Sequence, residues 1–373
     1  MNLGSRRTIA GAAAIALAWL ASALVAGQTA SEKPPMAEEV FKNVRVLKGM
    51  SVDEFMGAMG IFSAALGMSC EDCHLASDSK WENYALDTSP RKTTARRMIQ
   101  MMASINQGSF GGRQVVTCYT CHRGAAGPKV TPSLAAIYSA PPPEEPPDIV
   151  PAAAGGPSVD QVFDKYLQAL GGAQKLAGLT SFVAKGTSVG YGPEGTNRPV
   201  EIYAKGPDQR TTIIHTLDGD NTTTYDGRSA WVAAPHRPVA VLPLTGGDLG
   251  GVKLDAELSF PGRIKQTLGT WRVGSPTTID DRDVQVVQGT STGTLATFYF
   301  DSTTGLLVRL VRYAESRVGR LPTQFDFADY RDVAGVKMPF KWKMTWLDGF
   351  EDLTLTEIQP NVAIDAAKFA KPR

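Results

Sequence analysis

C-x-x-C-H occurs twice in this chain of 373 residues, as Cys70-Glu71-Asp72-Cys73-His74 and as Cys118-Tyr119-Thr120-Cys121-His122. These two segments, the first and second motifs, contain all four cysteines and two of the four histidines. The pattern is the attachment site of c-type haem, in which two thiols bind the porphyrin and the histidine binds iron. Two copies with no cysteine left over predict two covalently attached haem c groups. Their ligating residues would be Cys70, Cys73, Cys118 and Cys121 for attachment, and His74 and His122 for iron.

Two other chemistries use paired C-x-x-C segments. A zinc site would take four thiolates and leave both adjacent histidines unexplained. A redox disulfide normally lies at the strand-to-helix junction of a βαβ unit, and no such pattern surrounds either motif. Haem attachment is therefore favoured over both.

The N-terminus predicts export. Arg6 and Arg7 precede an apolar run of 17 residues, Ile9 to Val25, and small residues follow up to Ala30. A charged start, an apolar middle and a small-residue end are typical of a signal peptide, here residues 1–30. The run is at the short limit for a membrane span. We therefore expect cleavage and a periplasmic protein, with an uncleaved N-terminal membrane anchor as the alternative.

Composition divides the rest of the chain. Residues 139–157 are rich in Pro, Ala and Gly, which predicts an extended linker. It would separate a mainly α two-haem cytochrome c domain (31–138) from a cysteine-free domain (158–373). The net charge of the whole chain is +1, so nothing predicts nucleic-acid binding.

Each motif follows a predicted helix and a turn. Ser51 and Glu54 form the pattern of a capping box, and Gly67 ends that helix. In the second unit Ser89 is the predicted N-cap of a helix, and Pro90 takes its first helical position. Gly108, Gly111 and Gly112 are predicted to break this helix before Cys118. A helix across the distal face of a haem can supply a methionine, although helical methionines are more often core residues. The candidates are Met56 and Met59 in the first helix, and Met98, Met101 and Met102 in the second.

Several segments resemble the cytochrome c subunit of photosynthetic reaction centres. They are Lys42 to Leu47, Ser51 to Met59, Ala95 to Met102, and the string Val116-Thr-Cys-Tyr-Thr-Cys-His-Arg-Gly124. The resemblance covers residues 37 to 135 and implies electron transfer. It also implies that the distal iron ligands are Met59 and Met98.

The chain departs from this family in four ways. The family carries four haems, whereas this chain has motifs for two. Gly108 to Val116 contains no histidine that could ligate a haem elsewhere, and no cysteine can carry a lipid anchor. The second half of the chain is unrelated to the family. A free two-haem relative is therefore favoured, with a redox protein as donor and another as acceptor; a membrane complex remains a candidate partner.

The charges near the two motifs differ. Glu71 and Asp72 lie inside the first motif, while Arg96, Arg97 and Arg123 are assigned to the second. Because cationic neighbours stabilise the reduced state, the second haem is expected to have the higher potential.

The second domain predicts an α+β fold. A helix follows the capping box of Ser158 and Gln161, and alternating strands begin near Ser181. The pattern predicts one large antiparallel sheet that curves around the helix. The predicted strands are Val200–Ala204, Thr211–Leu217, Asn221–Tyr225, Ser229–Ala233, Val284–Gln288, Ala296–Phe300, Leu306–Tyr313, Gln324–Tyr330, Phe340–Trp346 and Leu353–Ile358, with a short helix near Asp248–Leu258.

This second pattern resembles the sheet folds of periplasmic lipoprotein carriers and sigma regulators. The resemblance implies a concave face that could bind an apolar ligand, with a filled core or docking module as the other interpretation. His215 and His236 are interpreted as ordinary strand and turn residues. The sequence predicts an electron-transfer protein and not an enzyme. A two-haem peroxidase and an apolar-ligand carrier with redox-sensing haems remain the alternatives.

Overall fold

The structure is a computed structural model that describes residues 33–372 apart from 75–80, 141–146, 191–195 and 236. The predicted signal peptide and His236 therefore lie outside the described residues. In the part of the chain that is described, no helix is long and apolar enough to cross a membrane.

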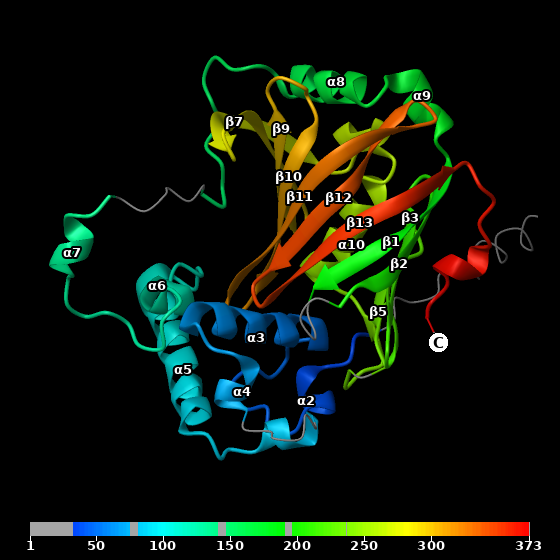
Figure 1. The fold of residues 1–373 in the computed structure, drawn as a ribbon. Helices are drawn as coiled ribbons and strands as arrows, with labels where there is room; N and C mark the ends of the chain where they lie inside the picture. Colours follow the sequence, from blue (N-terminus) through cyan, green and yellow to red (C-terminus); the bar gives the residue numbers. More distant parts are fainter. Residues whose placement is uncertain (1–32, 75–80, 141–146, 191–195, 236, 373) are drawn as a thin grey trace, which may run out of the picture. The chain divides into compact units, whose positions relative to one another are not determined.

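The N-terminal part consists of helices joined by irregular segments (Figure 1). The two longest helices are the predicted ones, and one ends at Gly67 in the left-handed conformation that favours glycine (φ 60°). The other begins at Pro90 and continues past Gly108 to Phe110, so the predicted break at Gly108 is wrong. A single glycine costs only about 1 kcal/mol in a helix and does not stop it. The elements are α2 (Ala37–Val40), α3 (Val52–Leu66), α4 (Cys70–Cys73), the 3-10 helix η1 (Trp81–Ala85), α5 (Pro90–Phe110), α6 (Cys118–His122) and α7 (Leu134–Ile137).

The C-terminal part is built on a sheet of thirteen antiparallel strands, which confirms the predicted α+β class. Neighbours along the chain pair with each other, except the sixth and seventh strands, which form the two edges of the sheet; the first strand pairs with the last, for example Phe182 with Pro360. The strands are β1 (Ser181–Gly190), β2 (Arg198–Lys205), β3 (Gln209–Thr216), β4 (Gly219–Tyr225), β5 (Ala230–Ala233), β6 (Val241–Pro243), β7 (Thr270–Ile279), β8 (Arg282–Ser291), β9 (Thr294–Asp301), β10 (Leu307–Ser316), β11 (Gly319–Val333), β12 (Val336–Trp346) and β13 (Gly349–Pro360).

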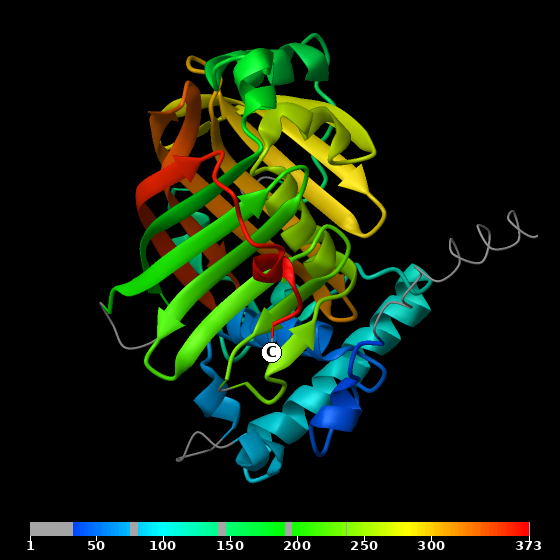
Figure 2. The ribbon, with the colours of Figure 1, turned by 90° about the vertical axis from the view of Figure 1, so that its right-hand side faces the viewer.

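Helices and aromatic side chains fill one face of the sheet. These helices are α8 (Val159–Ala169), α9 (Ala173–Gly178), α10 (Gly246–Glu257) and η2 (Pro261–Gln266), and η3 (Ala366–Phe369) follows the last strand. Phe163 of α8 is fully buried, and the centroid of its ring lies 4.8 Å from that of Trp271 and 5.9 Å from that of Phe300. Helix α10 packs on β9 and β10 and also on β3 and β4; Figure 2 shows it behind the green strands. The face that could have held an apolar ligand is occupied by the protein's own core.

The hairpin of β10 and β11 packs against helix α3. Its tip residue Val318 is 1% exposed and lies in one hydrophobic cluster with Ile61 of α3. The backbone N–H of Arg317 donates to Glu54 (3.1 Å), and its guanidinium donates to the Lys48 carbonyl (2.9 Å). This part of the sheet therefore contributes to the core on which α3 rests.

The predicted capping box at Ser51 and Glu54 is wrong, because the β10–β11 hairpin takes one of its side chains as a partner. Glu54 accepts the Arg317 N–H instead of its own helix's N–H, and the Ser51 hydroxyl lies 3.4 Å from the Thr245 hydroxyl. The box at Ser158 and Gln161 is confirmed, with reciprocal bonds of 3.2 and 2.7 Å.

The end of the Pro-rich segment lies along the sheet. Val150 is buried against Val284 and Val286, and its N–H donates to the buried Gln288 side chain (3.1 Å). Ala152 forms a single bridge to Gly274 of edge strand β7. The segment thus covers part of the outer face and the β7 edge, although its composition predicts no pairing.

Candidate functional site

The first motif forms one helical turn, α4, that is fixed at its start by Asp72. The Ser69 N–H and hydroxyl donate to one Asp72 carboxylate oxygen at 2.9 and 3.0 Å. These bonds, with a smaller contribution from the charge of Arg91, lower the pKa of Asp72. Cys70 and Cys73 are separated by three positions on this turn and therefore lie on the same side of it.

The second motif, α6, is also one helical turn that is fixed at its start, but by a hydroxyl group in place of a carboxylate. The Thr117 N–H donates to the Thr120 hydroxyl (3.0 Å). The approach to the turn is held by Asn106 of α5, whose side chain donates to the Val116 carbonyl (2.8 Å) and accepts the Val116 N–H (2.9 Å). Sequence reasoning missed Asn106, which is 7% exposed. A polar residue on the apolar stripe of α5 is the signal that could have indicated it.

Both motif histidines are oriented through Nδ1. This atom lies 2.9 Å from the Tyr84 carbonyl in His74 and 3.0 Å from the Ala125 carbonyl in His122. A carbonyl oxygen can only accept, so Nδ1 carries the proton and Nε2 keeps its lone pair. Burial is the main cause that lowers the pKa of His74, which favours the neutral ring that a metal requires. Two thiols on one turn and a neutral imidazole with a free Nε2 fit the donor set of c-type haem.

The thiols do not fit the two alternatives. Burial raises the pKa values of Cys70, Cys73 and Cys118, whereas a reactive redox dithiol needs a lowered pKa. Among the described residues, no group of three or more His, Cys, Asp or Glu side chains is placed to hold a metal. The two cysteine pairs therefore do not converge as a four-thiolate zinc site needs.

The candidate methionines divide into buried and exposed ones. Met102 is 6% exposed and is a core residue, while Met59 is partly buried against the same cluster. Met56, Met98 and Met101 are 38%, 37% and 47% exposed, so they are not core residues. The distal roles of Met59 and Met98 stay predictions.

A close backbone contact joins the two haem units. The N–H of Gly124, two residues after the second motif, donates to the Ala65 carbonyl of α3 (2.9 Å). A Cβ atom on Gly67, three residues before the first motif, would lie 2.3 Å from the Gly124 carbonyl oxygen. The helix that leads into the first motif is therefore fixed against the loop that follows the second.

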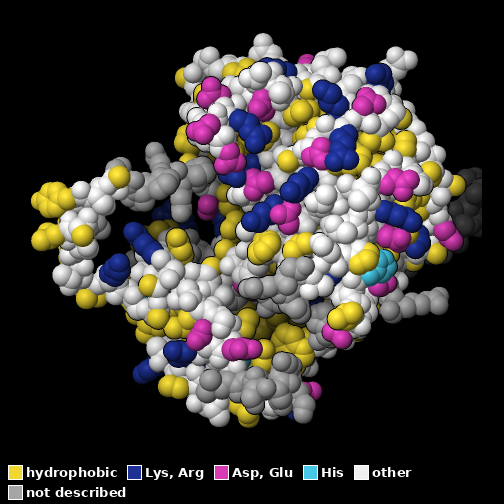
Figure 3. Space-filling model, in the orientation of Figure 1, with side chains coloured by type: hydrophobic (Ala, Val, Ile, Leu, Met, Phe, Trp, Pro, Cys, Tyr) yellow, Lys and Arg dark blue, Asp and Glu magenta, His cyan; other side chains and the backbone are white. Residues whose placement is uncertain are grey.

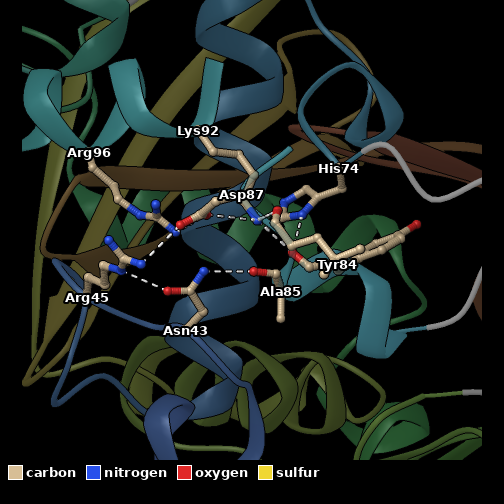
Figure 4. A network of polar contacts seen from close by, with 9 residues as sticks. Asn43, Arg45, His74, Tyr84, Ala85, Asp87, Lys92 and Arg96 are labelled. Atoms are coloured by element: carbon tan, nitrogen blue, oxygen red, sulfur yellow. Dashed lines mark hydrogen bonds and ion pairs between the residues drawn. The ribbon is translucent and has the colours of Figure 1, made fainter. Parts of the chain in front are cut away.

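A network around Asp87 supports the first motif (Figure 4). Its carboxylate pairs with Arg96 (2.8 Å), Arg45 (3.1 Å) and Lys92 (3.7 Å). Hydrogen bonding from Arg96 is the main cause that holds the pKa of Asp87 well below its usual range. The assignment of Arg96 to the second motif is therefore wrong, because its side chain turns toward the loop that holds His74. Nothing in the sequence near Asp87 indicated this role.

His215, interpreted from the sequence as an ordinary strand residue, lies in the sheet. His215 pairs with Asp220 across the β3–β4 hairpin (2.7 Å), as an ordinary strand residue does. Helix α7, in the segment that follows the second motif, carries exposed apolar side chains, with Leu134 71% and Ile137 59% exposed. Figure 3 shows apolar side chains on the left, where Figure 1 places α7.

Comparison with known proteins supports the resemblance read from the motifs. The family model described as photosynthetic reaction centre cytochrome C subunit matches residues 11–138. The photosynthetic reaction center cytochrome c subunit of Rubrivivax gelatinosus is 38% identical over 109 residues, 28% of either chain. That of Thermochromatium tepidum is 36% identical over 99 residues, 26% of this chain and 23% of that protein. The chain thus spans about a quarter of the length of the curated relatives it matches.

Solved structures similar to this chain cover its other half. A LolA superfamily protein from Nitrosomonas europaea is 14% identical with a TM-score of 0.39, over 58% of this chain and 99% of that one. A DUF1329 family protein from Desulfovibrio piger is 12% identical with a TM-score of 0.41, over 57% and 97%.

Proposed function

We propose that this protein is a periplasmic electron carrier with two covalently attached haem c groups. The observation that carries the proposal is the paired arrangement of thiol turn and histidine, in which each imidazole has a fixed Nδ1–H and a free Nε2. When bound, the haem supplies the one-electron couple of its iron. The family model that matches residues 11–138 and the relatives of this region are named as photosynthetic reaction centre cytochrome c subunits, which supports this chemistry.

The chain's own residues have distinct roles in this proposal. Cys70, Cys73, Cys118 and Cys121 would hold the two groups, and His74 and His122 would provide nitrogen ligands. Met59 and Met98 would provide thioether ligands, which favour the reduced state and raise the potential. The contact of Gly67 with Gly124 keeps the two units adjacent, as electron exchange between them requires.

The proposed organisation is a signal peptide (1–30), the two-haem domain (31–138), the linker (139–157) and the sheet domain (158–373). The electron donor and acceptor would be other redox proteins. Residues 111–135, which contain the second motif, include Arg113, Arg123 and Lys129 and no Asp or Glu, so a partner that approaches the second motif would carry acidic groups.

The experiment is to express the full chain with haem maturation and to measure haem content, mass and optical spectra. We expect two covalently bound haems, a methionine-to-iron charge-transfer band, and no carbon monoxide binding by the reduced protein. Met59→Ala and Met98→Ala should each remove part of that band and open one site to carbon monoxide. A wild-type protein with an open haem site would instead favour the two-haem peroxidase.

Of the alternatives, the carrier of an apolar ligand receives less support. The face that would hold an acyl chain is filled by Phe163, Phe298 and Phe300, each at most 1% exposed. A lipid found with the purified protein by native mass spectrometry would reverse this preference.

A further inference from the structure

The Tyr84 carbonyl, which orients His74, accepts a second hydrogen bond. Lys92 Nζ lies 2.8 Å from this oxygen, and His74 Nδ1 lies 2.9 Å from it (Figure 4). A carbonyl oxygen has two lone pairs, so both bonds can form at once. One of the two donors is a cation.

A cationic donor makes the carbonyl oxygen a weaker hydrogen-bond acceptor for the imidazole N–H. Charge-assisted bonds are about twice as strong as neutral ones, so Lys92 draws electron density from the oxygen that the His74 N–H also uses. The Nδ1–H bond of a ligating histidine normally increases the basicity of its other nitrogen. With a weaker acceptor, Nε2 donates less to a ferric iron, and the oxidised state loses stability.

We propose that Lys92 is a positioning and tuning residue that raises the reduction potential of the haem at the first motif through the Tyr84 carbonyl. This inference rests on the proposed function. It concerns a residue outside both motifs and outside the methionine ligands.

Several contacts hold Lys92 at this position. Its ammonium also donates to the Leu86 carbonyl (2.6 Å), and its side chain is only 11% exposed. Asp87 lies 3.7 Å away but is shared with Arg45 and Arg96, so one carboxylate faces three cations. The positive charge at Tyr84 is therefore not cancelled locally.

The second motif provides an internal comparison. His122 bonds to the Ala125 carbonyl, and no Lys or Arg among the described residues donates to that oxygen. Asp72 of the first motif is paired with Arg91 (3.2 Å), which reduces the acidic contribution expected from the sequence. The motif charges predict a lower reduction potential at the first motif than at the second. Because Lys92 raises the potential at the first motif, it makes this difference smaller.

The test is a redox titration of the full-length protein with both haems. Lys92→Met removes the donor and the charge, whereas Lys92→Gln can keep a neutral bond to Tyr84. We expect one of the two potentials to become more negative in Lys92→Met, by a smaller amount in Lys92→Gln, and the other potential to stay unchanged. The His74 Nδ1–H signal in NMR spectra should move in the direction of a stronger hydrogen bond.

Arg45→Gln is the matched control, because Arg45 pairs with Asp87 in the same network but does not donate to Tyr84. It removes one positive charge and should shift the potential less than Lys92→Met. Equal shifts in these two variants, or an unchanged His74 signal, would overturn the proposal in favour of a simple charge effect. A wild-type protein that binds no haem would instead overturn the proposed function, so the two failures are distinguishable.

Discussion

Asp248 of α10 is a half-buried carboxyl group in an acidic environment. Asp53 and Glu54 of α3 face it with their negative charges, and Arg312 of β10 partly compensates. Burial is the main cause that raises the pKa of Asp248 from 3.8 to about 6, and the charge of Asp53 adds to it. Asp53 itself is held by the Thr245 N–H and hydroxyl, both at 2.8 Å.

This pKa predicts the sign of a pH effect on stability. A carboxyl group with a raised pKa in the folded state favours folding when it is protonated, so stability is lost as the pH rises from about 4 to 6. A difference of about 2 pH units corresponds to about 3 kcal/mol of unfolding free energy above pH 6. Asp248→Asn, which imitates the neutral acid, should therefore stabilise the protein by up to about 3 kcal/mol at pH 8.

The assay is urea denaturation of wild type and Asp248→Asn at pH 4 and pH 8. The two proteins should have similar stability at pH 4, and the variant should have the higher midpoint at pH 8. Asp218→Asn is the control, because Asp218 is exposed in the β3–β4 turn and should give no pH-dependent difference. A variant that is less stable at pH 8, or a difference independent of pH, would refute the reasoning.

Three further changes test other parts of the molecule. Gly67→Ala should cost about 2 kcal/mol or more beyond Gly111→Ala in chemical denaturation, since both have φ near 60° but only the first would place a Cβ against the Gly124 carbonyl. Equal costs would show that the contact between the two haem units does not stabilise them. Val318→Ala should cost about 2 kcal/mol, because it removes two buried methyl groups from the cluster under α3; a cost below about 0.5 kcal/mol would count against that packing. Arg123→Gln should slow oxidation of the reduced protein by ferricyanide at low ionic strength, a difference that salt should abolish; stopped-flow rates that are equal at low salt would contradict it.

Local patterns predicted most of the helices and strands. The motifs, the ends of α3 at Ser51 and Gly67, and the start of α5 at Pro90 depend on residues close together in sequence, and so do the hairpin strands. The ten predicted strands lie within observed ones to within one or two residues at their ends. Strand β1 was indicated only by the alternation that begins near Ser181, and β6 and β7 were missed. Strand β7 carries Gly274 and Pro276 and lies at the sheet edge, which weakens its alternating pattern.

Two of the misses arise because a side chain takes its partner from another element of the fold and not from its nearest neighbours in sequence. Glu54 was expected to cap its own helix but accepts an N–H from a hairpin 263 residues away. Arg96 was assigned to the second motif by its neighbours in sequence, yet it pairs with Asp87 across the turn before α5. Charge and capping patterns identify groups that need partners, but they do not identify which partners fold against them.

The same distant contacts give the sheet a role that needs no ligand. The hydrophobic cluster under α3 contains Val318 and is extended by Leu321 and Leu347, which come from the sheet and its hairpins. Since α3 carries Met59 and ends next to the first motif, its position depends on these contacts. The β10–β11 hairpin therefore helps to set, by packing alone, the position of α3 and of Met59, the predicted iron ligand.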